Sequence, residues 1–156
     1  MSKSEPFQNT TIGFLEPSDL ETTKDGETII KISKENPDTL YLLIAYANWC
    51  GPCQMTKPVY AELSRFLDDN KMDKIRLLAI NTTGELPSEK DWARIAKEKL
   101  GVTGYPTILV VCKGSVIGKH EKSRDLPGFL ATLLTYRYKH SHGARLEHFG
   151  KPPVRG

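Results

Sequence analysis

The chain of 156 residues contains only three cysteines, too few for the disulfide framework of a small secreted protein. No segment approaches the roughly 20 apolar residues that a membrane-spanning helix needs. The first residues also lack the apolar run of a secretory signal. We therefore expect a protein of the reducing cytoplasm, with no membrane partner.

A strong charge of either sign is also missing, because the formal net charge is only +3. Five of the 22 Lys and Arg residues follow residue 136, but only one of the 19 acidic residues does. Three of the four histidines lie there as well. This composition predicts a flexible basic tail at 139–156, a disordered segment at 1–10 and one globular domain at 11–138. We expect a monomer and no nucleic-acid partner.

The most informative segment of the chain is Trp49-Cys50-Gly51-Pro52-Cys53. It joins the apolar run 40–46, which is typical of a buried strand, to a helical pattern at 53–70. Cys50 is therefore expected at a helix N-terminus, where free backbone N–H groups and the helix dipole favour a thiolate. Cys53 follows one turn later on the same side. The spacing predicts a redox couple in which Cys50 attacks and Cys53 resolves the mixed disulfide.

Two other interpretations of the cysteine pair are half of a zinc site and a structural disulfide without turnover. No second Cys-x-x-Cys follows, and Cys112 stands alone in an apolar strand. Gly51-Pro52 also suits a helix start, because proline is tolerated in the first turn. We therefore expect no metal site and no cofactor, and interpret Cys112 as a buried strand residue.

The pattern along the rest of the chain predicts alternating strands and helices. Residues 11–38 are compatible with either a hairpin or a strand followed by a helix. Beyond the helix at 53–70, strands are predicted at 74–81, 107–112 and 115–119. Ser88 is the expected N-cap of a helix that contains Trp92 and Leu100, and Asp125 of the last helix.

The chain resembles a known family. Trp49-Cys50-Gly51-Pro52-Cys53 matches the active-site signature of thioredoxin, and residues 39–139 are similar to the thioredoxin superfamily. A second match, at 102–107, corresponds to the cis-proline loop of the family. The resemblance implies an α/β thioredoxin fold, in which helices flank both faces of a central mixed β-sheet.

The resemblance also implies roles for the residues around the cysteines. Trp49 would shield one side of the site, Gly51 would let a substrate backbone approach, and Pro52 would stiffen the loop and favour a reducing potential. The Tyr105–Pro106 bond would be cis and lie beside the sulfurs. The Tyr105 backbone would pair with an extended substrate segment, and Thr107 would point toward the strand.

The sequence departs from the family at a buried ion pair. Ile44 stands where thioredoxins carry a buried aspartate, and Ala79 aligns with the lysine that accompanies it. Losing both avoids a single buried charge, but proton removal from Cys53 must then rely on water or a substrate group. We expect slower resolution of mixed disulfides and a gain in stability. The loop Glu121-Lys122-Ser123 lacks the glycine of the family and gives the rim more charge.

Together these features predict a thiol–disulfide oxidoreductase that reduces protein disulfides through Cys50 and Cys53. The expected partners are disulfide-containing proteins and a dithiol donor such as a thioredoxin reductase. Two alternatives stay open. One is a disulfide oxidase or isomerase, because Gly104-Tyr105-Pro106-Thr107 is common in disulfide isomerase domains. The other is a thioredoxin-fold binding module whose function is indifferent to redox state.

Overall fold

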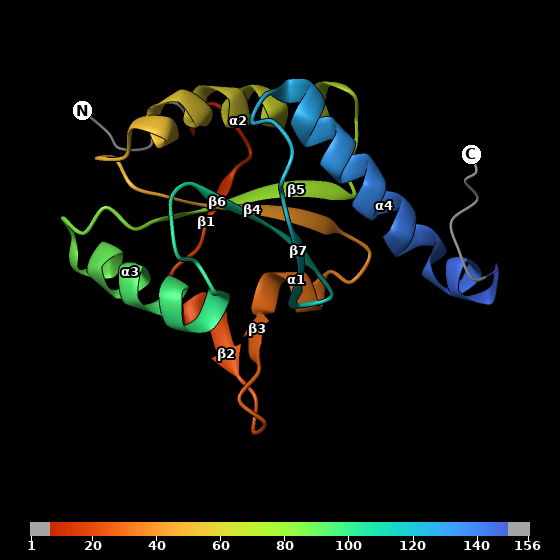
Figure 1. The fold of residues 1–156 in the computed structure, drawn as a ribbon, viewed down its shortest axis with the longest axis horizontal. Coiled ribbons are helices and arrows are strands. Elements are labelled where there is room, and N and C mark those ends of the chain that lie inside the picture. Colours follow the sequence, from red (N-terminus) through yellow and green to blue (C-terminus); the bar gives the residue numbers. More distant parts are fainter. Residues whose placement is uncertain (1–6, 150–156) are drawn as a thin grey trace.

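A five-stranded mixed sheet lies between two layers of helices in the computed structural model, which describes residues 7–149 (Figure 1). The strand order is β1-β5-β4-β6-β7. β1, β5 and β4 run parallel to one another, β6 is antiparallel to β4, and β7 is antiparallel to β6. This arrangement confirms the predicted mixed sheet with helices on both faces. The sheet strands are β1 (Gly13–Phe14), β4 (Leu40–Tyr46), β5 (Ile75–Asn81), β6 (Thr107–Cys112) and β7 (Ser115–Lys119).

The helices α2 (Gly51–Asp69) and α4 (Leu126–Phe149) cover one face of the sheet, and α3 (Pro87–Leu100) lies on the other (Figure 1). The central strand β4 supplies side chains to both faces, because successive residues of a strand point to opposite sides. Ile44 and Tyr46 belong to the core beneath α2 and α4, whereas Leu43 and Ala45 belong to the core beneath α3. Every residue of β4 is buried. Burial on both faces therefore explains why the sequence of β4 is apolar without alternation.

The helix α2 is fixed to the sheet by a buried tyrosine. The Tyr60 hydroxyl lies 3.0 Å from the Leu42 carbonyl oxygen and 2.9 Å from that of Leu78. These two carbonyls belong to β4 and β5, so one side chain contacts two neighbouring strands. The helix that carries both cysteines is thereby held at a fixed position above the sheet.

The segment 11–38 combines both structures that its sequence allowed. β1 pairs in parallel with β5, and β2 (Leu20–Thr22) forms an antiparallel pair with β3 (Thr28–Ile30). A short helix α1 (Lys31–Glu35) follows directly. A 3-10 turn η2 (Pro17–Asp19) separates β1 from β2.

The prediction that residues 1–10 are disordered is wrong for residues 7–10, and residues 1–6 lie outside the described residues. Phe7 is only 5% exposed, and its ring lies 5.9 Å from Tyr46 and 6.0 Å from Tyr60, centroid to centroid. Burial of an aromatic ring offsets the entropy cost of ordering this short segment. The domain therefore begins earlier than residue 11.

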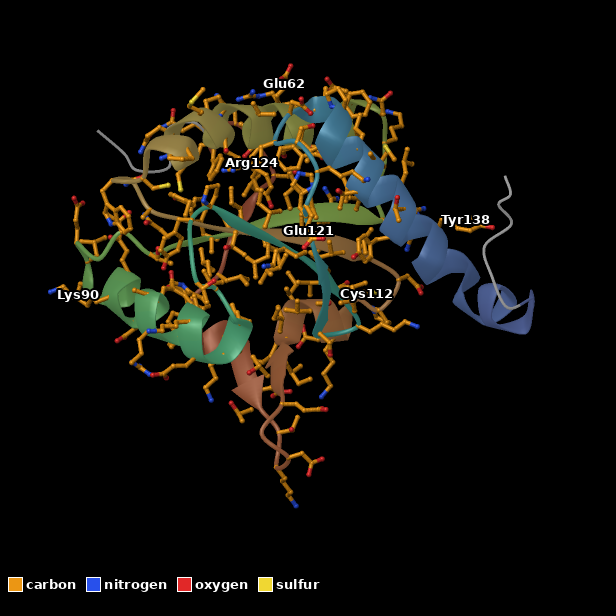
Figure 2. All side chains as sticks on the ribbon, in the orientation of Figure 1. Glu62, Lys90, Cys112, Glu121, Arg124 and Tyr138 are labelled. Atoms are coloured by element: carbon orange, nitrogen blue, oxygen red, sulfur yellow. The ribbon has the colours of Figure 1, made fainter. Side chains whose placement is uncertain are left out.

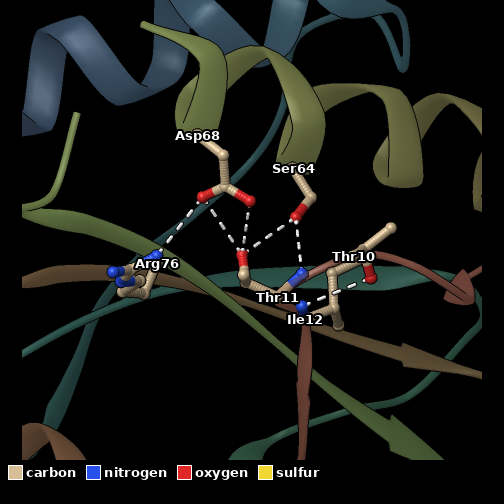
Figure 3. A network of polar contacts seen from close by, with 6 residues as sticks. All are labelled: Thr10, Thr11, Ile12, Ser64, Asp68 and Arg76. Atoms are coloured by element: carbon tan, nitrogen blue, oxygen red, sulfur yellow. Dashed lines mark hydrogen bonds and ion pairs between the residues drawn. The ribbon is translucent and has the colours of Figure 1, made fainter. Parts of the chain in front are cut away.

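Polar contacts hold the same N-terminal segment against α2 and β5 (Figure 3). The Thr11 hydroxyl donates to Asp68 Oδ2 at 2.9 Å, and the Thr11 N–H donates to Ser64 Oγ at 3.4 Å. Asp68 also forms an ion pair with Arg76 of β5, at 3.3 Å. The chain entering β1 is thus tied to a helix and to a strand that lie more than 50 residues later.

The start of one helix differs from its predicted position, and the start of another agrees with it. The helix α3 begins at Pro87, so Ser88 is not its N-cap. Proline is favoured at the first helical position, and the Glu89 carboxylate accepts hydrogen bonds from the N–H groups of Glu85 and Leu86. Asp125 does cap α4, because its Oδ1 accepts a hydrogen bond from the Gly128 N–H at 2.8 Å.

The helix α4 continues to Phe149, so the predicted flexible tail is helical over residues 139–149. This stretch contains one glycine and no proline, and a helix already nucleated by packing extends at little cost through such residues. The remainder of the predicted tail, 150–156, lies outside the described residues. Within residues 7–149, no helix is both long and apolar enough to cross a membrane.

Cys112 lies at the opposite end of β4 from the cysteine pair. Cys112 pairs in register with Leu40, at the start of β4, whereas Cys50 follows the end of that strand. Figure 2 labels it on the side of α1. It is buried, as predicted. The loop residues Glu121 and Arg124, labelled in the same view, are exposed.

We expect Phe7→Ala to lower the free energy of unfolding by about 3 kcal/mol, because it removes a buried ring from the core. Chemical denaturation followed by circular dichroism measures the change. Phe14→Ala is the matched control, because Phe14 is 40% exposed and contacts the same cluster. It should cost less than about 1 kcal/mol. Equal losses in the two variants would contradict a buried N-terminal anchor.

Candidate active site

Cys50 lies at the end of the loop that joins β4 to the first turn of α2. It is the N-cap residue of the helix, and its Sγ accepts a hydrogen bond from the Cys53 N–H at 3.2 Å. This N–H is one of the free donors at the helix start, and together with the dipole it stabilises negative charge on the sulfur. The Cys50 thiol also donates to the Tyr105 carbonyl oxygen at 3.5 Å. Cys50 is 7% exposed.

Cys53 occupies a different environment one helical turn later. Its side chain is fully buried. Burial raises the pKa of the Cys53 thiol to about 12, and the hydrogen bond and charge of Cys50 act in the same direction. The Ala47 backbone and the charge of Lys57 act in the opposite direction. At neutral pH Cys53 is therefore a neutral thiol, and Cys50 and Cys53 are both in the reduced form in this structure.

The predicted site residues of two distant segments come together around Cys50. The Trp49 indole is 66% exposed, and its Nε1 donates to the Thr83 carbonyl oxygen at 3.1 Å. Its ring meets that of Tyr105 edge to face, with centroids 5.7 Å apart. The Tyr105–Pro106 peptide bond is cis, the isomer that the sequence resemblance implies. Trp49 and Tyr105 thus form one aromatic wall beside the sulfur.

The remaining predicted residues lie at the edges of this wall. Gly51 and Pro52 are exposed at the start of α2. A side chain at Gly51 would meet no atom of the chain within 4 Å, so the space above it is open. Thr107 begins β6, is 9% exposed, and its hydroxyl donates to the Gly104 carbonyl oxygen at 2.6 Å. It fixes the turn that carries Pro106.

The two positions that lack the family's buried ion pair are direct neighbours. Ile44 of β4 and Ala79 of β5 pair in the parallel register, and both are fully buried. Both belong to the core that also contains Cys53. Because Ile44 and Ala79 are apolar, neither of these two strand positions places an ionisable group near Cys53.

Sequence reasoning missed one ionisable residue of this site, Lys57. Its side chain is only 3% exposed, although lysine is almost never fully buried unless it is paired. Lys57 lies four residues after Cys53, and Tyr60 and Ser64 continue the same buried stripe. This spacing was the available signal, because residues four apart in a helix share one face.

Among the residues whose side chains the structure describes, no group of three or more His, Cys, Asp or Glu residues is arranged to hold a metal ion. The chemistry that the site offers is exchange between a dithiol and a disulfide. A partly exposed sulfur stabilised by a helix N-terminus and a fully buried neutral thiol three residues later are the two groups that this exchange requires. These features define a thiol–disulfide oxidoreductase with a thioredoxin-type sheet.

Comparison with known proteins gives the family. The model of the thioredoxin family matches residues 22–134, so the chain belongs to this family. Thioredoxin of Bacillus subtilis is 33% identical over 85 residues, which cover 54% of this chain and 70% of that protein. Protein disulfide isomerase-like 2-2 of Oryza sativa is 33% identical over 99 residues, 62% of this chain, but this chain spans only 23% of its length.

A solved structure shares the fold as well. In the crystal structure of a complex of ferredoxin:thioredoxin reductase and thioredoxin f2, the matching chain is 26% identical, with a TM-score of 0.51. The match covers 68% of this chain and 84% of that one. The relatives thus include both thioredoxins and a disulfide isomerase-like protein, and thiol–disulfide exchange is the activity that they share.

We expect a thiol-alkylating reagent to modify Cys50 at least about tenfold faster than Cys53 or Cys112 in the folded, reduced protein. Only the thiolate reacts, and burial raises the pKa of both other thiols. Peptide mass spectrometry after timed quenching measures the three rates. In denaturant the rates should converge, which serves as the control. Modification of Cys53 first would contradict these assignments.

Proposed function

We propose that this oxidoreductase acts as a reductant of protein disulfides in the cytoplasm, as a monomer. The observation that carries the proposal is the asymmetry of the two sulfurs. Cys50 is 7% exposed and precedes Gly51, above which the space is open, whereas Cys53 is neutral and fully buried. A substrate disulfide can therefore reach Cys50 first, and Cys53 is held back for the second step.

The exchange then proceeds in two balanced steps. The Cys50 thiolate attacks one sulfur of the substrate disulfide, forms a mixed disulfide and releases the other substrate sulfur as a thiolate. Cys53 loses its proton and attacks Cys50 Sγ, which breaks the mixed disulfide and releases the second substrate sulfur. The substrate leaves as a dithiol, and the protein is left with a Cys50–Cys53 disulfide.

The shape of the surface supports an extended protein segment as substrate. Trp49 and Tyr105 form an aromatic wall, and Gly51 leaves room for a backbone to approach the sulfur. A peptide lying across this wall would place its disulfide at Cys50. The cis Tyr105–Pro106 turn would supply backbone groups to the same peptide.

A dithiol donor must return the Cys50–Cys53 disulfide to the reduced state. The thioredoxin f2 chain in complex with ferredoxin:thioredoxin reductase supports a reductase as donor, because this chain matches it over 68% of its length. We propose a thioredoxin reductase-type enzyme for this role. The second candidate function is a disulfide oxidase or isomerase, which the match to the rice isomerase-like protein favours.

Reduction of a protein disulfide such as that of insulin tests the activity directly. We expect turnover with a chemical dithiol as donor, and loss of at least about a hundredfold in Cys50→Ser, because the attacking thiolate is gone. Cys53→Ser should accumulate a mixed disulfide with the substrate, visible on a non-reducing gel. A Cys112→Ala control should keep the activity. Full substrate function in Cys50→Ser would instead indicate a redox-indifferent binding module.

The equilibrium reduction potential of the Cys50–Cys53 couple separates a reductant from an oxidant. We expect a value near about −270 mV, as in thioredoxins, and not the value near about −120 mV of strong oxidants. Equilibration in a dithiothreitol buffer, followed by alkylation and mass measurement, gives the potential. A value well above about −200 mV would favour the oxidase or isomerase.

A further inference from the structure

A buried lysine lies beside the second cysteine, although the strand positions around it are apolar. The Lys57 side chain is 3% exposed, and its Nζ donates to Asn48 Oδ1 at 2.8 Å. The same Nζ lies 4.9 Å from the centroid of the Tyr46 ring, over its face. These two contacts fix the position of the amine. Among the side chains that the structure describes, no carboxylate forms an ion pair with it.

The position of Lys57 places its charge next to Cys53. The two residues are four apart in α2 and both lie on its buried face, where side chains of this spacing are neighbours. Tyr46 is the last residue of β4, and Asn48 lies in the loop that leads from β4 to Cys50. The amine is therefore bound to the segment that carries the nucleophile, and not to the solvent.

The contacts of Asn48 extend toward α3. The Asn48 N–H donates to Thr83 Oγ1 at 2.9 Å, and the Thr83 hydroxyl donates to Asn81 Oδ1. Asn81 Nδ2 in turn donates to Glu89 Oε2 at 3.3 Å. Glu89 is 5% exposed. A connected set of polar groups thus holds the backbone of Asn48, whose side chain accepts the hydrogen bond from the amine.

The electrostatic effects of the two buried groups are mutual. Burial lowers the pKa of Lys57, and the charge of Cys53 opposes this shift. The charge of Lys57 in turn lowers the pKa of Cys53, against the larger effect of burial. The other titratable groups here are Cys50, which acts on Cys53, the Tyr46 hydroxyl, and Glu89, whose charge acts on Tyr46. Lys57 is the one cation among them.

We propose that Lys57 is a positioning residue for the resolving step of the reaction: its ammonium group, held by Asn48 over the Tyr46 ring, stabilises the Cys53 thiolate as that thiolate attacks the mixed disulfide. The inference rests on the proposed function of the Cys50–Cys53 couple. In this step the Cys53 proton leaves to solvent, a bond forms between Cys53 Sγ and Cys50 Sγ, and the substrate sulfur departs as a thiolate. Lys57 keeps its proton throughout.

Stoichiometric dithiobis(nitrobenzoate) separates the two steps, because each releases one coloured thiolate. The first phase reports attack by Cys50, and the second reports attack by Cys53 on the mixed disulfide. We expect Lys57→Met to slow the second phase about tenfold at neutral pH, because a shift of one pKa unit changes the thiolate fraction tenfold. The second-phase pH profile should move to higher pH. The first phase should stay within about twofold.

Three further variants complete the experiment. Lys57→Arg, which keeps the charge, should restore most of the second phase. Arg65→Met removes an exposed cation from the same helix and should change neither phase. Met is similar in length to Lys and places no charge in the buried site, so we expect Lys57→Met to fold. Circular dichroism checks this, and Lys57→Gln is a second neutral variant.

The possible outcomes distinguish this inference from the function on which it rests. A second phase in Lys57→Met with the rate and pH profile of the unaltered protein would overturn the role of Lys57. Equal slowing in Lys57→Met and Lys57→Arg would also overturn it, because packing and not charge would then be responsible. Absence of the first phase in the unaltered protein would instead refute the exchange activity itself.

Discussion

The complete burial of β4 is the constraint on which the rest of the structure depends. All seven of its residues pair with β5 along one edge, six of them pair with β6 along the other, and both faces are covered. A shift of one residue would turn each side chain into the opposite core, which the different shapes of the two cores resist. The end of this strand therefore has one position, and Cys50 follows it after a short loop. The fixed position of β4 therefore also fixes the position of Cys50.

The same strand explains why the fold could be predicted from the sequence over much of its length. The runs 40–46 and 107–112 are nearly continuous apolar stretches, and short stretches of this kind are typical of strands buried on both faces. The motif at 49–53 marks the start of α2, and Asp125 marks that of α4 through a local hydrogen bond. Each of these signals is contained in a few neighbouring residues. Such signals can be read without knowing what the segment packs against.

Features that depend on distant partners could not be predicted in this way. β1 has two residues, and its pairing with β5 is set by contacts with a strand more than 60 residues away. Phe7 lies in a polar segment, and contacts with the distant rings of Tyr46 and Tyr60 make its burial favourable. The site shows the same division. The cysteines and the proline loop follow from local motifs, but the burial of Lys57 depends on Asn48 and on the ring beneath it.

The location and sign of the buried charge set how it can act on the second cysteine. A carboxylate on β4 could take the proton of Cys53, but once ionised it would repel the thiolate. Because Ile44 and Ala79 are apolar, the charged group that acts on Cys53 is instead a cation on α2, Lys57. A cation favours the thiolate without accepting its proton, which must leave through solvent. Because the pKa of Cys53 is about 12, the resting dithiol holds almost no thiolate at neutral pH. The charge of Lys57 therefore acts mainly on the transient thiolate of the resolving step, and it changes the rate of that step more than the equilibrium potential.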